Sequence, residues 1–248
     1  MTQDAIRKNN EQYWNLNADH WFGTTALPNY APQFVTETDL ALFGDVSGKK
    51  MLEIGCGSGH SIKYHADCNA GELWGLDISR SQIENAKRYL SAFGYSPKLI
   101  CSPMEEECGI PTEYFDIAYS IYAIGWTTDL DQTFEKIASY LKPDGVFIFS
   151  WKHPIHFCTA VKENQVVFEK CYFDESWFVQ HVDDGDVLLC NREISTYVNA
   201  LAKAGFCIEQ MIEQTDAETM TLTGEMQDKY KKAQKHPLSF VFKARKMK

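Results

Sequence analysis

The segment Glu53-Ile-Gly-Cys-Gly-Ser-Gly, residues 53–59, has the residue types and spacing of a loop that wraps a small ligand. It stands directly after a short apolar stretch and before a segment with helical spacing. Its glycines let the backbone turn sharply and let a ligand lie against bare main chain. A dinucleotide-binding fingerprint reads G-x-G-x-x-G. This loop departs from it, because His60 and Ile62 stand where the last glycine would fall in either alignment.

An acidic residue, Asp77, ends the next apolar stretch beyond the loop. A carboxylate at that place can accept hydrogen bonds from both ribose hydroxyls of a nucleoside. The loop and the acid together indicate a cofactor that contains adenosine. These two features alone do not separate a nicotinamide dinucleotide from S-adenosylmethionine.

The elements that would position these residues follow from the hydrophobic pattern. Seven short apolar stretches have the composition of strands: residues 51–54, 73–76, 98–101, 115–119, 146–150, 206–212 and 238–244. Helical patterns lie between several of them. Ser79 and Gln82 form a capping box at the start of one helix, and Gly205 closes another where a left-handed cap is needed. Such alternation predicts an α/β doubly wound domain with a mostly parallel sheet covered on both faces.

Two regions fall outside this alternation. Residues 1–48 show a helical pattern over 5–17, then an aromatic loop, then a second helix near 34–43. Residues 152–191 follow the fifth strand and are rich in aromatic residues, which indicates a β-rich insertion and not a linker.

The composition is that of an ordinary globular protein. Of 248 residues, 44% are hydrophobic and 23% are charged, and the net charge is −10. This acid excess argues against binding to nucleic acid or an anionic membrane, because both need a basic surface. The eight cysteines include no Cys-x-x-Cys pair, so no metal site is expected. The first residues lack the apolar core of a signal peptide, and we expect a reduced, cytoplasmic protein.

Four motifs in order resemble the class I S-adenosylmethionine-dependent methyltransferases, in particular their small-molecule branch: LEIGCGSGH, LWGLDIS, YFDIAYSIYAIGW and LKPDGVFIFSW. The resemblance implies a Rossmann-like sheet of seven strands, the last one antiparallel, with S-adenosyl-L-methionine as cofactor and a small-molecule acceptor. It also implies one methyltransferase domain in four parts: an N-terminal lid segment (1–48), a cofactor-binding half (49–151), a substrate-lid insertion (152–191) and the C-terminal half of the sheet (192–248).

The resemblance also assigns cofactor contacts position by position. They are Glu53, Gly55, Cys56, Gly57 and Gly59 around the methionine part, Asp77 on the ribose, Ile78, Met104 and Glu105 around the adenine, and Ser120 at the start of the loop that faces the sulfonium. One position departs from the family, because Pro103 stands where an aspartate is common.

Methyl transfer needs mainly alignment of the acceptor, the methyl group and the sulfur, so few residues of the acceptor site need acid–base chemistry. His153 follows the fifth strand at the carboxyl end of the sheet and is the candidate base or substrate anchor. An equally supported interpretation makes it a cap of the strand end. The candidate acceptor pocket consists of aromatic side chains: Tyr13, Trp21, Tyr30, Tyr122, Trp126, Tyr172 and Trp177.

Other functions stay open at this stage. A module that binds the cofactor without catalysis would share the glycine loop and Asp77. An RNA or protein methyltransferase is disfavoured by the net charge and by Ser120-Ile-Tyr-Ala, which is unlike the sequence that grips planar amino groups of nucleobases. The sequence gives no support for an oligomer, and it does not name the acceptor atom.

Overall fold

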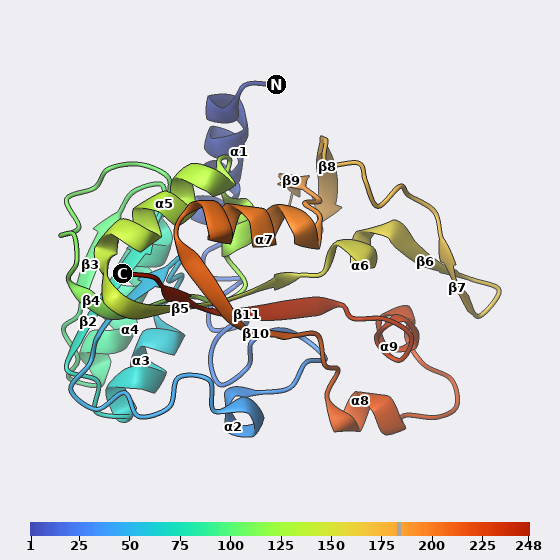
Figure 1. Ribbon diagram of the computed structural model, residues 1–248. Coiled ribbons are helices and arrows are strands. Elements are labelled where there is room, and N and C mark those ends of the chain that lie inside the picture. Colours follow the sequence, from blue (N-terminus) through green and yellow to red (C-terminus); the bar gives the residue numbers. More distant parts are fainter. Residues whose placement is uncertain (183–184) are drawn as a thin grey trace.

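The computed structural model describes residues 1–182 and 185–248 and is built around one seven-stranded sheet (Figure 1). In spatial order its strands are β10 (Phe206–Ile212), β11 (Ser239–Lys246), β5 (Leu141–Lys152), β4 (Phe115–Ser120), β1 (Lys50–Ile54), β2 (Glu72–Asp77) and β3 (Lys98–Cys101). Strand β11 is antiparallel to both of its neighbours, and the other pairs are parallel. The predicted mostly parallel sheet with an antiparallel last strand is thereby confirmed.

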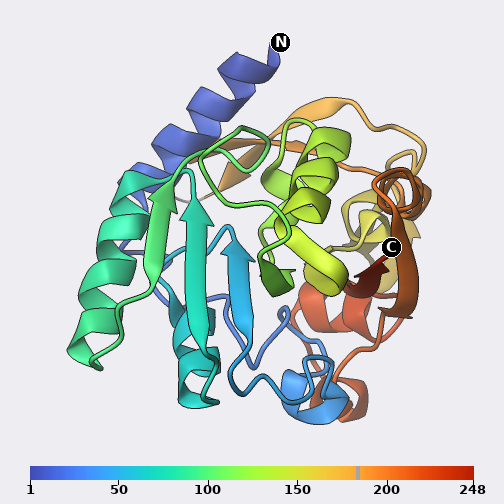
Figure 2. The same ribbon diagram turned by 60° about the vertical axis from the view of Figure 1, so that its left-hand side comes forward.

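The strand order reverses at β1, which has β2 on one side and β4 on the other. The arrowheads of β1, β2 and β3 point to the end of the sheet where the N-terminal helix lies (Figure 2). In open α/β sheets, ligands bind at such a reversal, outside the carboxyl ends of the strands. The topology therefore directs attention to the turns that follow β1, β2 and β4.

Helices and loops cover both faces of the sheet (Figure 1). The helices are α1 (Gln3–Leu16), α2 (Glu37–Leu40), α3 (His60–Asp67), α4 (Arg80–Ala92), α5 (Leu130–Tyr140), α6 (Pro154–Cys158), α7 (Ile194–Lys203), α8 (Ala217–Thr221) and α9 (Asp228–Ala233), with a 3₁₀ turn η1 (Ile124–Trp126). Alternate side chains of β5 point to opposite faces of the sheet. Phe147 and Phe149 pack with the buried residues of α5 and α7, while Ile148 packs with the N-terminal segment on the other side. Buried residues thus pack on both faces of the sheet, as a doubly wound fold requires, and the cluster around Ile148 is called the second core.

The second helix predicted near residues 34–43 is only the single turn α2. The reason is the Glu37 side chain, whose carboxylate accepts hydrogen bonds from the backbone N–H groups of Leu42 (2.9 Å) and Phe43 (3.0 Å). Ala41, which precedes Leu42, takes a left-handed conformation (φ 48°). The chain therefore leaves the helix after one turn and places Leu42 and Phe43 in the core.

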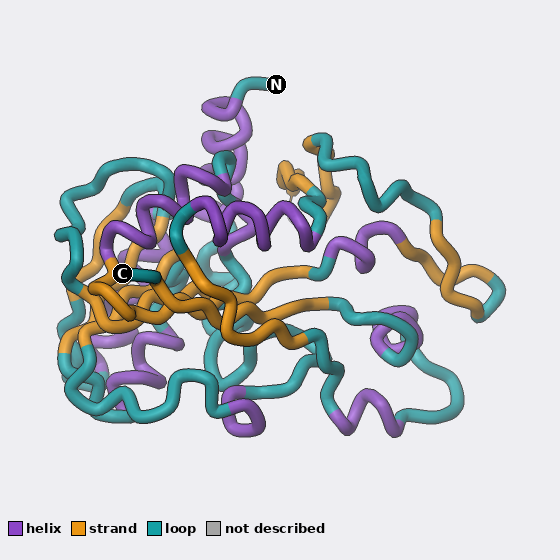
Figure 3. The backbone as a smooth tube through the Cα atoms, viewed as in Figure 1, coloured by secondary structure: helices purple, strands orange, loops and turns teal. Residues whose placement is uncertain are grey.

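The insertion after β5 forms two separate antiparallel hairpins (Figure 3). They are β6 (Thr159–Lys162) with β7 (Gln165–Phe168), and β8 (Trp177–Val182) with β9 (Gly185–Cys190). Strand β9 meets α1, where the Asn10 amide donates to the Leu188 carbonyl (2.8 Å) and accepts from the Leu188 N–H (2.9 Å). The predicted β-rich insertion is confirmed, and it holds the N-terminal helix. No helix in the described ranges has the length and apolarity that a membrane crossing needs.

One buried hydroxyl joins the N-terminal segment to the loop after β4. Ser150 Oγ donates to the Tyr30 carbonyl (2.7 Å) and accepts from the Tyr122 N–H (2.9 Å). The Ser150→Ala variant would leave two buried backbone groups unpaired. We expect it to lower the free energy of unfolding by about 2–4 kcal/mol, measured by urea denaturation.

The matched control is Ser91→Ala, which removes a hydroxyl that bonds the Arg88 carbonyl at an exposed position. It should change stability by no more than about 0.5 kcal/mol. Equal stability of the two variants would show that Ser150 does not join the two segments.

Candidate active site

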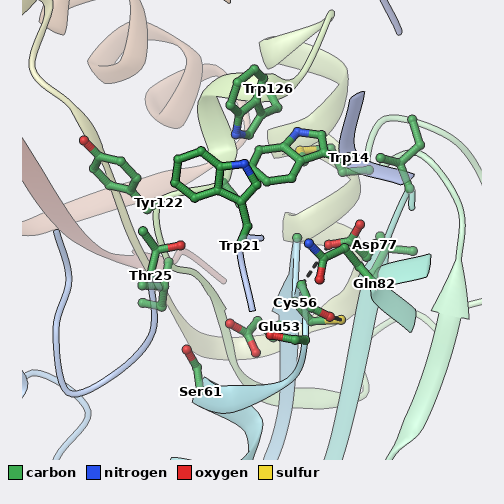
Figure 4. Close-up of a pocket in the computed structure, with 18 of the residues that line it drawn as sticks. Trp14, Trp21, Thr25, Glu53, Cys56, Ser61, Asp77, Gln82, Tyr122 and Trp126 are labelled. Carbon is green, nitrogen blue, oxygen red and sulfur yellow. Dashed lines mark hydrogen bonds between the residues drawn. The ribbon is translucent and has the colours of Figure 1, made fainter. Parts of the chain in front are cut away.

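A pocket lies at the carboxyl ends of β1, β2 and β4, between the glycine loop and the N-terminal segment (Figure 4). Its empty space is about 970 Å³, a figure that includes volume open to solvent. Residues from several separate parts of the chain line it: Arg7, Asn10, Trp14, Trp21, 23–26, Glu53, 55–58, His60, Ser61, 76–78, Gln82, 102–105, 121–123 and Trp126.

At Gly55 the glycine loop presents bare backbone, because the neighbouring Ala123 leaves no room for a side chain. Gly55 has φ +70°, and a Cβ there would lie 2.4 Å from the Cβ of Ala123. The N–H groups of Gly55 and Cys56 donate to the Leu76 carbonyl (2.7 and 3.0 Å), which fixes the loop on the end of β2. The structure thus gives a cradle that only glycine can provide at position 55.

Asp77 lies at the end of β2 beside this loop. Its carboxylate accepts from the backbone N–H of Gly57 (2.8 Å) and of Ser79 (2.9 Å). Burial raises the pKa of Asp77 to about 6 in spite of these two bonds. The group is therefore ionised at neutral pH, with further lone pairs that can accept from ligand hydroxyls.

Glu53 is buried in the floor of the pocket, where burial and the nearby Asp77 raise its pKa well above the usual range. The Tyr119 hydroxyl lies 3.5 Å from its Oε2 atom. A carboxyl group that costs free energy to bury ionised is suited to a site where a bound positive charge compensates for the burial.

The residues fit an adenosine-containing cofactor on an observation independent of the sequence motif. Gln82 lines the pocket, and its buried Oε1 atom has no hydrogen-bond partner among the described residues. Hydroxyl or amino groups of a bound nucleoside would supply the missing donor. The capping box predicted at this helix is only half formed: Ser79 Oγ accepts from the Gln82 N–H (3.2 Å), while the Gln82 side chain faces the pocket.

The turn after β3 also lies in the pocket wall, with Ser102, Pro103, Met104 and Glu105. The Glu105 carboxylate is already engaged, because it accepts from the Thr128 hydroxyl (2.5 Å) and lies 3.9 Å from the Arg7 guanidinium. Its place in the wall agrees with the predicted position, and its partners hold it toward the loop after β4.

The opposite wall is aromatic. Trp14, Trp21, Tyr122 and Trp126 come from three different segments and gather above the carboxylates (Figure 4). The Trp14 ring is 5.2 Å from Trp126 at 86° and 6.1 Å from Trp21 at 61°. Gly125 makes this possible, because a Cβ there would lie 1.8 Å from the Trp151 ring that supports Trp126.

Most of the predicted site residues meet in this pocket: Glu53, Gly55, Cys56, Gly57, Asp77, Ile78, Met104, Glu105, Trp21, Tyr122 and Trp126. Three others lie just behind its wall. Gly59 starts α3 and makes room for Leu90 of α4, and Ser120 is fully buried. Tyr13 accepts a hydrogen bond from the Trp21 indole N–H (2.8 Å) and so orients that ring without lining the space itself.

The structure corrects the predicted placement of His153. Its Nδ1 accepts from the Ile155 N–H (3.1 Å) at the start of α6, and its Nε2 lies 2.6 Å from a Glu213 carboxylate oxygen. Burial lowers its pKa more than Glu213 raises it. The ring is outside the pocket lining, so the geometry favours the strand-end cap over the catalytic base.

Three predicted aromatic pocket residues also lie elsewhere. Tyr30 is completely buried in the second core, where its hydroxyl donates to Glu37. Tyr172 accepts from the Ile194 N–H (3.2 Å), and Trp177 faces the Arg192 guanidinium at 5.5 Å. Each of the three side chains has a structural partner outside the pocket. The prediction placed them in the pocket because it relied on aromatic residue type alone.

Sequence reasoning missed several lining residues: Arg7, Asn10, Thr25, Ser61 and Gln82. Arg7, Asn10 and the aromatic Trp14 have the spacing of one face of a helix, and this was the signal available for α1. Thr25 carries no such pattern, because it stands in an irregular loop.

The fold and the family match support a class I S-adenosylmethionine-dependent methyltransferase, an enzyme with S-adenosylmethionine as its cofactor. Residues 52–149 match the family model described as a methyltransferase domain. The structure resembles that of an S-adenosylmethionine-dependent methyltransferase from Mesorhizobium loti, with a TM-score of 0.70 and 22% identity, covering 84% of this chain and 95% of the other.

Two curated relatives extend the comparison. An uncharacterized protein of Haemophilus influenzae is 29% identical over 227 residues, which are 85% of this chain and 86% of that protein. A malonyl-[acyl-carrier protein] O-methyltransferase of Methylovorus is 29% identical over 147 residues, 56% of this chain. The match spans only 48% of the length of the latter, so its substrate does not transfer to this chain.

The crowding at Gly55 yields a test of the cradle. We expect Gly55→Ala to weaken S-adenosylhomocysteine binding at least tenfold, because the new methyl group displaces either the loop or Ala123. Isothermal titration calorimetry measures this effect.

Gly94→Ala is the matched control, since Gly94 has φ +80° but no atom within 4 Å of the added Cβ. It should cost about 1 kcal/mol of stability and leave the affinity unchanged. A Gly55→Ala protein that binds normally would refute the cradle.

The pKa of Asp77 predicts a pH dependence of cofactor affinity. Only the ionised carboxylate has all its lone pairs for ribose hydroxyls, so affinity should be constant above pH 7 and fall as pH drops through about 6. The limit is about tenfold per pH unit below the pKa. Titrations of S-adenosylhomocysteine at several pH values should show this decline in the native protein, whereas Asp77→Asn should bind weakly with an affinity independent of pH.

Proposed function

We propose that the protein transfers a methyl group from S-adenosylmethionine to a small-molecule acceptor that binds against the aromatic wall. The observation that carries the proposal is the two-sided pocket. One side has the glycine cradle with Asp77 and Gln82, and the other has the tryptophans from α1, the following loop and η1. Such a pocket can hold a cofactor and a small acceptor together, while a macromolecule would reach it only by an extended side chain.

The residues of the chain do the positioning. The loop backbone, Asp77 and Gln82 would hold the cofactor, which when bound supplies a methyl group on an electrophilic, positively charged sulfonium. The aromatic rings would exclude water and fix the acceptor at the distance needed for an in-line approach. The Methylovorus relative is named for a malonyl group on an acyl-carrier protein, so a carrier-bound small acyl group is a further candidate acceptor.

A general base is not part of the proposal. His60 is the imidazole among the described lining residues, and it stacks on Tyr89 at 3.9 Å while its Nδ1 shares a hydrogen bond with Ser58. Burial lowers its pKa, with a contribution from Lys63. This ring is held by Ser58 and Tyr89, so an acceptor that arrives protonated is expected to lose its proton to water.

The test is calorimetric titration with S-adenosylmethionine, S-adenosylhomocysteine and NAD in parallel. The first two should bind and NAD should not. Asp77→Ala should lose about 1.5–3 kcal/mol of binding free energy, as expected for hydrogen bonds to a charged group. The control Asp228→Ala changes an exposed aspartate at the start of α9 and should bind normally. Heat from NAD with none from the sulfonium pair would refute the assignment.

A further inference from the structure

The aromatic wall has the construction of a binding site for a cation. We call Trp14, Trp21, Tyr122 and Trp126 the aromatic corner. Each of these rings is only partly buried, although it packs against buried core residues, because part of its surface faces the pocket. Tryptophan is the side chain whose ring face attracts cations most strongly, and the corner contains three.

The rings are held in fixed orientations. Tyr13 accepts the Trp21 indole N–H at 2.8 Å, so that ring keeps its surface toward the pocket and its polar atom away. Trp14 and Trp126 meet at 86°, and the Trp151 ring lies 5.4 Å from Tyr122 and 5.6 Å from Trp126. Perpendicular walls supported from behind form a preorganised corner and not a collapsed cluster.

The charges around the corner favour the same sign of ligand. The described lining contains the carboxyl groups of Glu53, Asp77 and Glu105, and its basic side chains are Arg7 and His60. Arg7 is paired with Glu106 at 2.7 Å and with Asp4, and His60 has a lowered pKa. No unpaired cation of the described lining is therefore ready to meet a carboxylate or phosphate, while a positive ligand meets the aromatic rings.

We propose that the acceptor is an alkyl amine and that the aromatic corner binds its nitrogen, which becomes an ammonium when methylated. This inference rests on the proposed function and names its substrate class. A second possibility uses Lys152 at the end of β5, whose contacts among the described residues are with the rings of Trp151 and Phe157. Its ammonium faces the Phe157 ring at 5.2 Å and is not part of the pocket lining, so an anionic acceptor is the weaker alternative.

The charge balance of the reaction explains why a cation site suits an amine. The amine first releases its proton to water. Its nitrogen lone pair then forms the N–C bond, the electrons of the broken C–S bond return to sulfur, and the positive charge passes from sulfur to nitrogen. One positive charge is present before and after, so rings that attract it need not lose their interaction as the reaction proceeds. With an anionic oxygen acceptor the charges would cancel, and the aromatic corner would stabilise only the starting state.

The test compares two probes that differ in one atom. Choline and 3,3-dimethyl-1-butanol have the same shape, with a quaternary nitrogen in one and a carbon in the other. In the complex with S-adenosylhomocysteine, we expect choline to bind about tenfold more tightly than its carbon analogue, measured by calorimetric titration. Equal affinity of the two probes, or no measurable binding of choline, would overturn the proposal.

Variants locate the effect. Trp126→Leu should abolish the preference for choline, and Trp126→Phe, which keeps a ring, should retain part of it. Trp177→Leu, in the insertion and outside the pocket, should bind both probes like the native protein. A preference that survives in Trp126→Leu would place the cation elsewhere and overturn the assignment.

A turnover assay distinguishes a failure of the amine proposal from a failure of the proposed methyltransferase function. Release of S-adenosylhomocysteine should occur with tertiary alkyl amines and not with alkyl carboxylates of the same length. Turnover with carboxylates alone would overturn the amine and favour Lys152. Failure of S-adenosylhomocysteine to bind at all would instead refute the proposed function. Its binding is therefore measured first, before choline or its carbon analogue is added.

Discussion

The site depends on one constraint: the backbone after β1 must pass between the end of β2 and Ala123. The N–H groups of Gly55 and Cys56 bond to the Leu76 carbonyl, and the missing side chain of Gly55 leaves Ala123 its place. This contact sets the distance between the loops after β1 and β4. Asp77, whose carboxylate accepts from the next N–H of the same loop, takes its position from it as well. The positions of the cofactor cradle and of the acceptor wall therefore both depend on this contact.

The aromatic wall shows how segments that are distant in the sequence meet beside the glycine loop. Trp14 and Trp21 come from the start of the chain, and Tyr122 and Trp126 from its middle. Their approach needs small or polar residues at particular places: Gly125 for the supporting Trp151, and Ser150 for the backbone at Tyr122. The wall is thus a product of packing in the core, and its geometry does not depend on contacts among the exposed ring surfaces alone.

The sequence predicted the parts of the molecule that are local. Strands, the glycine loop and Asp77 are signalled by composition and spacing over short distances, and these were located correctly. The pocket aromatics were predicted only in part, because residue type does not show which side chains converge. Tyr30 and His153 satisfy their polar atoms with Glu37 and Glu213, partners that residue type alone does not reveal. For Gln82 the error is the reverse. The sequence pattern predicted that its side chain caps a helix, but its Oε1 atom has no partner among the described residues and can bind a ligand.

The position of β11 has a consequence for the order in which the protein is made. This strand lies between β5 and β10, and it is the neighbour that bonds β10 into the sheet. The strands β1 to β5 can pair while the chain is still being synthesised, and they already contain the cradle and Asp77. Strand β10 must wait without a partner until β11 leaves the ribosome, so an exposed edge of β5 persists through synthesis of residues 153–238. A nascent chain stalled within that interval would carry a formed cofactor loop on an open sheet, and chaperones that bind extended edges would find it there.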